Sequence, residues 1–238
     1  MLVSAAVCPH PPLLVPELAE ENAAELDDLR AACLGAIDAV RATEPELLVV
    51  VGTGGATRPH PAGTRGSFAS YGVDLEVTLP GGDPPRGGGH DLPLSLTVGA
   101  WLLTESGWTG HVRGLEVDAA TPPAECRSLG AAVAQEADRV GMLVMGDGSA
   151  RRSTEGPGYL DPRAEVFDAE VAEALWAGDP AGLLAIDPVL GAELQAAGRA
   201  AWQVLAGASA EVLFDAEVAY DAAPSGVGYM VAVWERHG

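Results

Sequence analysis

Met142-Leu143-Val144-Met145-Gly146-Asp147-Gly148-Ser149-Ala150 is the stretch that decides the fold of this 238-residue chain. Its first four residues form an unbroken apolar run, which is typical of a parallel strand covered on both faces. A tight Gly-Asp-Gly turn follows. Such a turn at the end of a strand is where an open α/β sheet usually builds its site. The stretch therefore predicts a buried strand that ends at a pocket.

Two more apolar runs of strand length occur earlier in the chain, at Leu2 to Val7 and at Leu47 to Val51. Between them, apolar residues at helical spacing predict a helix within Leu18 to Val40. This order of elements predicts parallel strands joined by crossover connections. Such connections place the strand ends together. We therefore expect the turns at His10, Thr53 and Asp147 to meet at one edge of one sheet.

The rest of the chain continues the α/β pattern. The sequence predicts strands at Val73–Leu79 and Val112–Val117, and helices at Leu92–Glu105, Ala124–Asp138 and Arg163–Ala177. Two Asp-Pro pairs, at Asp179 and Asp187, each predict a helix start, because the Asp can cap a helix whose first residue is Pro. Alternating residues at Val212–Tyr220 and Val227–Val233 predict a hairpin. We expect one domain over residues 1–238, an α/β fold with a central, mostly parallel mixed sheet flanked by helices and with C-terminal antiparallel strands.

The charge of the chain limits its partners. The formal net charge is −21, from 34 acidic residues against 13 arginines and no lysine. Nucleic-acid binding is not expected, because a phosphate backbone favours a basic surface. The acidic residues are spread along helices, which is typical of a solvated surface. The absence of lysine also removes Schiff-base chemistry and a lysine phosphate clamp.

Composition also bears on the location of the protein. No apolar run approaches the roughly 18 residues of a membrane span, so no membrane partner is expected. The residues from Met1 to Val7 do not resemble a secretory signal. Three cysteines without metal-type spacing, Cys8, Cys33 and Cys126, favour free thiols in a reducing cytoplasm.

Several short motifs together carry a family resemblance. They are Cys8-Pro9-His10-Pro11-Pro12-Leu13-Leu14-Val15-Pro16, His90-Asp91-Leu92-Pro93-Leu94-Ser95-Leu96, Gly146-Asp147-Gly148-Ser149, Gly158-Tyr159-Leu160-Asp161-Pro162-Arg163, Phe167-Asp168, and Ala223-Pro224-Ser225-Gly226-Val227-Gly228-Tyr229. In this order, and over nearly the whole chain, they resemble the class III extradiol ring-cleavage dioxygenases. The chain is most similar to the subunit-B-like branch that also contains the Memo-like proteins.

The resemblance implies a non-haem ferrous site at the strand ends. Two histidines and a glutamate hold the iron and leave positions for a catechol and dioxygen, a ligand set that suits Fe(II). A further histidine, in a Gly-Asp-x-Ser-His turn, acts as acid and base, because its pKa lies near neutrality. Family members also assemble with other chains. The resemblance therefore implies Fe(II) or another divalent metal as cofactor, a small aromatic or other small-molecule ligand, and a possible homo-oligomer.

The metal ligands are only partly present. His10 matches the first ligand position, although an isolated histidine in a turn can also be a hydrogen-bonded turn residue. The second histidine is expected after Leu47–Val51, where the chain has Thr53 between two glycines. His60 follows in Arg-Pro-His-Pro and can supply a ligand only if its loop folds over the pocket. Otherwise it is a surface-loop residue.

The acid/base position is occupied by Ala150, and a methyl group cannot transfer a proton. Ring cleavage would then lose a step whose acid/base help is typically worth roughly 100- to 10,000-fold. Arg151 and Arg152 offer fixed positive charge beside it, but arginine hardly deprotonates. They are alternatively solvated loop charges.

The carboxylate ligand is not identified by the sequence. Glu211 and Glu217 lie on a late strand whose alternation directs them away from the core. Asp147 and Ser149 are expected in the pocket with His10 and Thr53, although Asp after Gly is also simply favourable turn chemistry.

Three hypotheses follow. In the first, the pocket is retained and the iron site is degraded, so the protein is a non-catalytic or altered small-molecule-binding protein with metal weakly bound or absent. In the second, it is an active metal-dependent oxidoreductase whose site is rebuilt from His10, His60 or His90 and an acid. In the third, it is a partner subunit that acts only in a complex. Fold alone does not decide among them.

Overall fold

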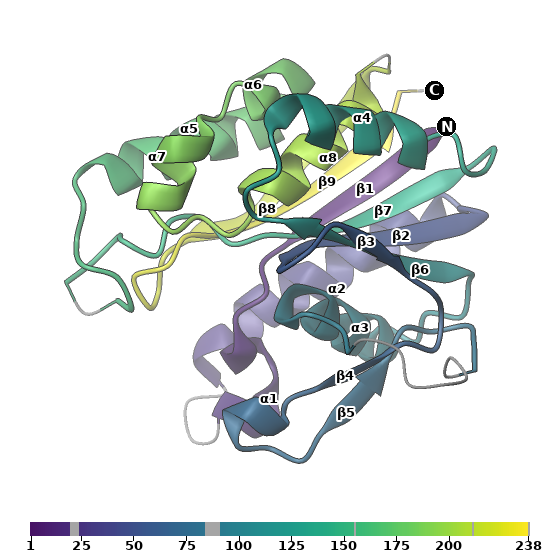
Figure 1. The fold of residues 1–238 in the computed structure, drawn as a ribbon, viewed down its shortest axis with the longest axis horizontal. Helices are drawn as coiled ribbons and strands as arrows, with labels where there is room; N and C mark the ends of the chain where they lie inside the picture. Colours follow the sequence, from purple (N-terminus) through teal and green to yellow (C-terminus); the bar gives the residue numbers. More distant parts are fainter. Residues whose placement is uncertain (20–23, 84–90, 155, 211, 238) are drawn as a thin grey trace.

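Parallel strands form the centre of the fold: β1 (Leu2–Cys8), β2 (Leu47–Gly54), β6 (Val112–Asp118) and β7 (Val140–Met145). The computed structural model describes residues 1–19, 24–83, 91–154, 156–210 and 212–237. In it these strands belong to a seven-stranded sheet in the order β3-β6-β2-β7-β1-β9-β8 (Figure 1). The three apolar runs that predicted parallel strands thus lie side by side. That prediction is confirmed.

Antiparallel strands complete the sheet on both sides. On one side, β9 (Tyr229–Arg236) pairs with β1, and β8 (Phe214–Ala222) pairs with β9. On the other side, the short strand β3 (Arg58–His60) pairs with β6. The predicted mixed sheet with a C-terminal antiparallel hairpin is therefore correct. Strand β3 falls in a passage for which the sequence predicted no regular structure.

Helices cover both faces of the sheet (Figure 1). Side chains of β2 alternate between two apolar cores, so that Val49 contributes to one and Val50 to the other. No helix in the described ranges is both long and apolar enough to cross a membrane. One face carries α4 (Pro123–Val133), α5 (Arg163–Trp176), α6 (Pro180–Leu184), α7 (Pro188–Glu193) and α8 (Arg199–Ser209), and the other carries α2 (Asp27–Ala42) and α3 (Leu94–Glu105).

Helix α8 is buried along its whole length, from Arg199 to Ser209. It lies between the sheet and α4. A Cβ atom at Gly130 of α4 would lie 2.6 Å from the amide nitrogen of Ala208, so only glycine lets the two helices approach this closely. Its polar side chains, Arg199, Gln203 and Ser209, are buried along with the apolar ones. The sequence predicted no helix here.

The two predicted Asp-Pro helix starts are confirmed. The carboxylate of Asp179 accepts a hydrogen bond from the Ala181 amide at 2.9 Å and begins α6. The carboxylate of Asp187 does the same for Val189 at 2.8 Å and begins α7. In each case the side chain satisfies a backbone donor that has no partner within the helix.

Other predicted bounds need correction. The strand expected at Val73–Leu79 is only β5 (Glu76–Thr78), and it pairs with β4 (Arg65–Ser67) in a separate small sheet. The helix expected from Leu18 is divided, because α1 (Pro16–Ala19) is separate from α2 and residues 20–23 lie outside the described part. Helix α4 ends at Val133, five residues before the predicted end. Short 3-10 segments include η1 (Pro12–Leu14) and η3 (Ala69–Tyr71).

Candidate functional site

The turns after the central strands meet at one edge of the sheet, as expected. Met145 of β7 lies opposite Cys8 of β1 and opposite Gly52 of β2, so the three strands end at the same level. The backbone N–H of His10 donates a hydrogen bond to Oδ1 of Asp147 at 2.7 Å. The Pro-rich turn and the Gly-Asp-Gly turn are thus directly joined at the carboxyl ends of parallel strands, where open α/β sheets bind ligands.

His10 is held mainly by its backbone. Its side chain is 8% exposed, and Nδ1 lies 3.5 Å from Oδ1 of Asp147. Nδ1 is buried and has no hydrogen-bond partner among the described residues. The imidazole therefore lies at the strand-end edge beside one carboxylate, with one ring nitrogen unused.

Three of the sequence motifs come together behind this turn. The Gly148 amide donates to the Gly228 carbonyl at 2.7 Å, and the Gly228 amide donates to the Ser149 carbonyl at 2.9 Å. The Ser149 amide donates to Oδ1 of Asp168 at 2.7 Å. A Cβ atom at Gly228 would lie 2.8 Å from Cγ of Asp168, so the motif needs glycine for this close approach. The motifs therefore act together as a framework for the turn.

Asp168 forms the buried centre of this framework. It is 2% exposed and pairs with Nη1 of Arg152 at 3.0 Å. Burial raises the pKa of the Asp168 carboxyl, while the Ser149 amide and the Arg152 guanidinium act to lower it. The reading of Arg152 as a solvated loop charge is therefore wrong. Nε of Arg151 is also buried, and the structure gives it no hydrogen-bond partner.

Ser149 and Ala150 serve to hold the turn. The Ser149 hydroxyl donates to the Leu194 carbonyl at 3.0 Å and accepts from the Arg151 amide at 3.1 Å. The Ala150 amide also donates to Leu194, and the Ala150 methyl packs against the apolar core. This position contributes no ionisable group, and the Ser149 hydroxyl is committed to backbone partners.

The structure places His60 neither over the pocket nor in a surface loop, the two alternatives that the sequence left open. It is a residue of β3, is 3% exposed, and its Nε2 lies 2.9 Å from Oε2 of Glu116. It is therefore a buried strand residue and not an exposed loop residue. The loop does not fold over the pocket, because residues 58–60 extend along β6 as a strand.

Glu116 is a buried carboxylate that the sequence reasoning missed. It accepts hydrogen bonds from the amides of Gly55 and Ala56 and from the side chains of Arg58 and His60. Burial acts to raise its pKa, but hydrogen bonds from His60 and Arg58 outweigh burial and lower the pKa below its ordinary value. An acidic residue between two apolar residues of a predicted strand, Leu115-Glu116-Val117, was the available signal, because a buried charge needs partners.

A cavity of about 360 Å³ opens beside Thr53 at the same edge of the sheet. Such a volume lies in the range of small-molecule sites, roughly 300–1,000 Å³. Most of its wall is apolar. The hydroxyl of Thr53 donates to the Ala197 carbonyl at 2.6 Å and so ties β2 to the segment before α8. Ten residues line the cavity: Thr53, Ala119, Pro188, Gly191, Ala192, Gln195, Ala196, Ala197, Arg199 and Ala200.

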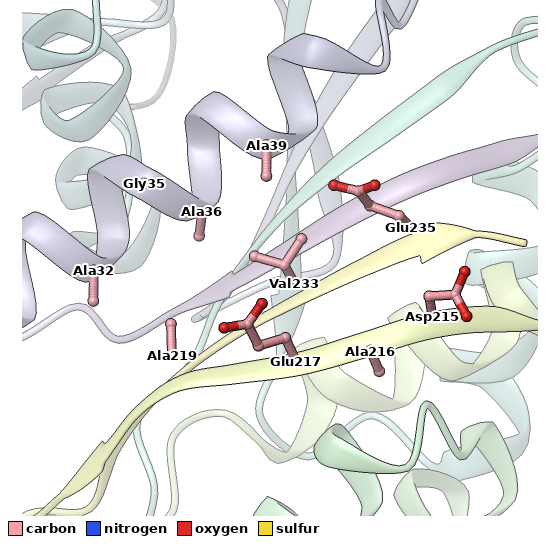
Figure 2. Close-up of a pocket in the computed structure, with 10 residues that line it drawn as sticks. All are labelled: Ala32, Gly35, Ala36, Ala39, Asp215, Ala216, Glu217, Ala219, Val233 and Glu235. Carbon is pink, nitrogen blue, oxygen red and sulfur yellow. The ribbon is translucent and has the colours of Figure 1, made fainter.

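A second cavity, of about 470 Å³, lies between α2 and the β8–β9 hairpin. Figure 2 shows Ala32, Ala36 and Ala39 on the side of α2 that faces the strands carrying Glu217 and Glu235. Glu217 therefore lies on the face of the hairpin away from the Phe214 side, as the alternation predicted. It points into this groove and not toward the strand-end turns.

The described residues do not fit an iron site. Within residues 1–19, 24–83, 91–154, 156–210 and 212–237, no group of three or more His, Cys, Asp or Glu is arranged to hold a metal ion. His10 lies beside Asp147, whereas His60 is bonded to Glu116 on another strand. Two of the candidate ligands, His90 and Glu211, lie outside the described residues.

Comparison with known proteins gives a fold and no function. No protein-family model and no curated protein matches the chain. Among solved structures, the fold is similar to that of an uncharacterized protein, JW3007, from Escherichia coli K12. The TM-score is 0.56 and the sequence identity is 15%, over 98% of this chain and 99% of that chain. At this identity the likeness supports the shared fold alone.

Proposed function

We propose that this protein binds a small molecule on a scaffold like that of the class III extradiol dioxygenases, and that its iron site is degraded. The observation that carries the proposal is the separation of the imidazoles. His10 and His60 lie beside different carboxylates, Asp147 and Glu116. A facial iron site needs its ligands around one point with open positions beside it.

The strand-end positions support the same proposal. The second histidine of the resembled family is replaced by Thr53, whose hydroxyl is used to hold Ala197. The acid/base histidine is replaced by Ala150. What remains at this edge is a cavity of about 360 Å³ with a small-residue wall, which suits binding better than proton transfer. Any divalent metal is expected to bind weakly, since few ligands converge there.

We also propose a cytoplasmic location. The cysteines Cys8, Cys33 and Cys126 are all free and buried. Free thiols are favoured in a reducing compartment. The acidic composition continues to argue against a nucleic-acid partner. A small aromatic or other small-molecule ligand is the proposed partner, and a homo-oligomer stays a prediction.

The experiment is a ring-opening assay with protocatechuate, supplied with Fe(II) and oxygen. The unmodified protein is expected to give no absorbance change from ring opening. Ala150→His alone should restore little, because the second ligand is still missing. Robust cleavage by the unmodified protein would contradict the proposal and favour the active oxidoreductase.

A double variant tests the scaffold. Thr53→His combined with Ala150→His returns both lost imidazoles, and Thr53 is the better position because a Cβ atom at Gly54 would lie 2.6 Å from Cγ of Glu116. Thr53→Asn combined with Ala150→Asn is the control for polarity and bulk. Cleavage by the histidine pair and not by the asparagine pair would show a decayed site on an intact scaffold.

A further inference from the structure

We propose that the cavity beside Thr53 takes a small carboxylate with an apolar body, and that Arg199 is the residue that binds its charge. This inference rests on the proposed small-molecule function and specifies the ligand class. It is argued from Arg199, from the start of α8, and from the remaining wall of the cavity.

Arg199 is a buried cation that lines the cavity and is 4% exposed. Its Nη1 donates to the Thr121 carbonyl at 2.5 Å and to Oε1 of Gln203 at 3.1 Å, and its Nη2 donates to the Ala119 carbonyl. All three acceptors are neutral. Buried charges are normally paired with an opposite charge. The positive charge of Arg199 is thus oriented by hydrogen bonds while no acidic side chain among them neutralises it.

The contrast with other described arginines strengthens this point. Arg58 pairs with the buried Glu116 at 2.7 Å, and Arg152 pairs with the buried Asp168 at 3.0 Å. In a chain with a net charge of −21, acidic partners are abundant. A buried arginine held by neutral acceptors at a cavity wall is therefore a site prepared for an external anion.

The start of α8 adds a second attraction for negative charge. Arg199 is the first residue of this helix, and Arg199 and Ala200 both line the cavity. No described side chain caps the helix, and its first turn contains no acidic residue. The amide groups at a helix N-terminus and the helix dipole favour an anion. The residue that carries the buried positive charge thus also begins the helix, and both Arg199 and the helix start belong to the wall of the same cavity.

The remaining wall selects the rest of the ligand. Apart from Arg199, only Thr53 and Gln195 of the lining residues have polar side chains. One fixed positive charge matches one negative charge, so a carboxylate suits the site better than a doubly charged phosphate. The small apolar side chains leave space for an apolar body such as a single ring.

The test uses benzoate and its neutral analogue benzamide, titrated into the isotope-labelled full chain and followed by amide NMR shifts. Benzoate is expected to shift the amides of Thr53, Ala197 and Arg199. Benzamide is expected to bind at least about tenfold more weakly, since it lacks the charge. Arg199→Met should lower benzoate affinity by at least about tenfold, and Arg199→Lys should keep part of it.

Two further variants keep the test decisive if Arg199→Met fails to fold. Ala197→Leu leaves Arg199 in place and fills the cavity, so it should also remove benzoate binding. Arg127→Met removes an exposed positive charge from α4 and should leave the affinity unchanged.

Equal affinity for benzamide, unchanged affinity in Ala197→Leu, or shifts confined to residues away from the cavity would each overturn the inference. Absence of benzoate binding would overturn it as well. The proposed function is contradicted by a different result, which is ring cleavage by the unmodified protein in the protocatechuate assay. Failure of this inference is therefore distinguishable from failure of the proposed function.

Discussion

The backbone N–H of His10 donates to Oδ1 of Asp147 at 2.7 Å, which joins the turns after β1 and β7. The backbone carbonyl of Asp147 accepts a hydrogen bond from the Gly198 amide at 2.8 Å, just before α8. Asp147 thus connects the Pro-rich turn to the helix whose first residues line the cavity. One of these contacts is made by its carboxylate and the other by its backbone carbonyl, so Asp147 holds the turns together through both groups.

Asp147→Ala should destabilise the protein, because the His10 amide loses its acceptor. An unsatisfied buried donor costs about 1–3 kcal/mol. Asp147→Asn keeps an acceptor oxygen and should cost less. Urea unfolding measures both variants. Equal stability of Asp147→Ala and the unmodified protein would show that the contact does not hold the two turns.

Glu116→Gln should lower the free energy of unfolding at neutral pH by about 3 kcal/mol, because the change removes the carboxylate of a buried charge pair. The folded state lowers the pKa of Glu116 below its ordinary value of about 4.5. The stabilisation is therefore present above that value. This stabilisation is lost as the pH falls from about 4.5 toward the lower pKa of the folded state, since the unfolded state then binds the proton first.

The measurement for this variant is urea unfolding of both proteins from pH 7 down to the acid range. The stability difference between them should shrink as the pH falls below about 4.5. The control is Glu136→Gln, which breaks a partly exposed ion pair with Arg113 and should cost about 0–1 kcal/mol. A difference that grows toward acid pH would contradict the direction of the Glu116 pKa shift.

Gly228→Ala should destabilise the protein by about 1–3 kcal/mol, because the new methyl group would press on the buried Asp168 carboxylate. Gly35→Ala is the matched control. Its Cβ atom would meet nothing within 4 Å, and alanine favours a helix interior by about 0.5–1 kcal/mol. The midpoint temperature of thermal unfolding should therefore fall for Gly228→Ala and rise for Gly35→Ala. A neutral Gly228→Ala would show that the motif does not need close backbone approach.

The sheet was largely predictable because its strands carry strong local signals. The apolar runs that end near Val7, Val51 and Met145 are buried along almost their whole length, which is typical of parallel strands covered on both faces. Helix α8 was missed because no capping side chain marks its start, and because burial of its polar residues Arg199 and Gln203 is defined only by tertiary packing. Strand β5 was overestimated because alternation alone does not reveal how many residues find a partner strand.

The candidate site was predictable only where neighbours in space follow directly from strand order. His10 and Asp147 could be placed together, because both follow parallel strands. The pairing of His60 with Glu116 depends on β3 joining the sheet edge, which no local pattern indicated. Arg199 gave no signal in the sequence either. Its importance comes from burial and neutral partners, which only tertiary packing defines.

The most direct test of the central claim is the iron content of protein purified without oxygen and supplied with Fe(II). Few metal ligands converge at the strand-end edge, so affinity should be weak. The expected result is well under one equivalent of iron per chain, with little change in His10→Ala. One full equivalent that is lost in His10→Ala would contradict the account and indicate a working metal site.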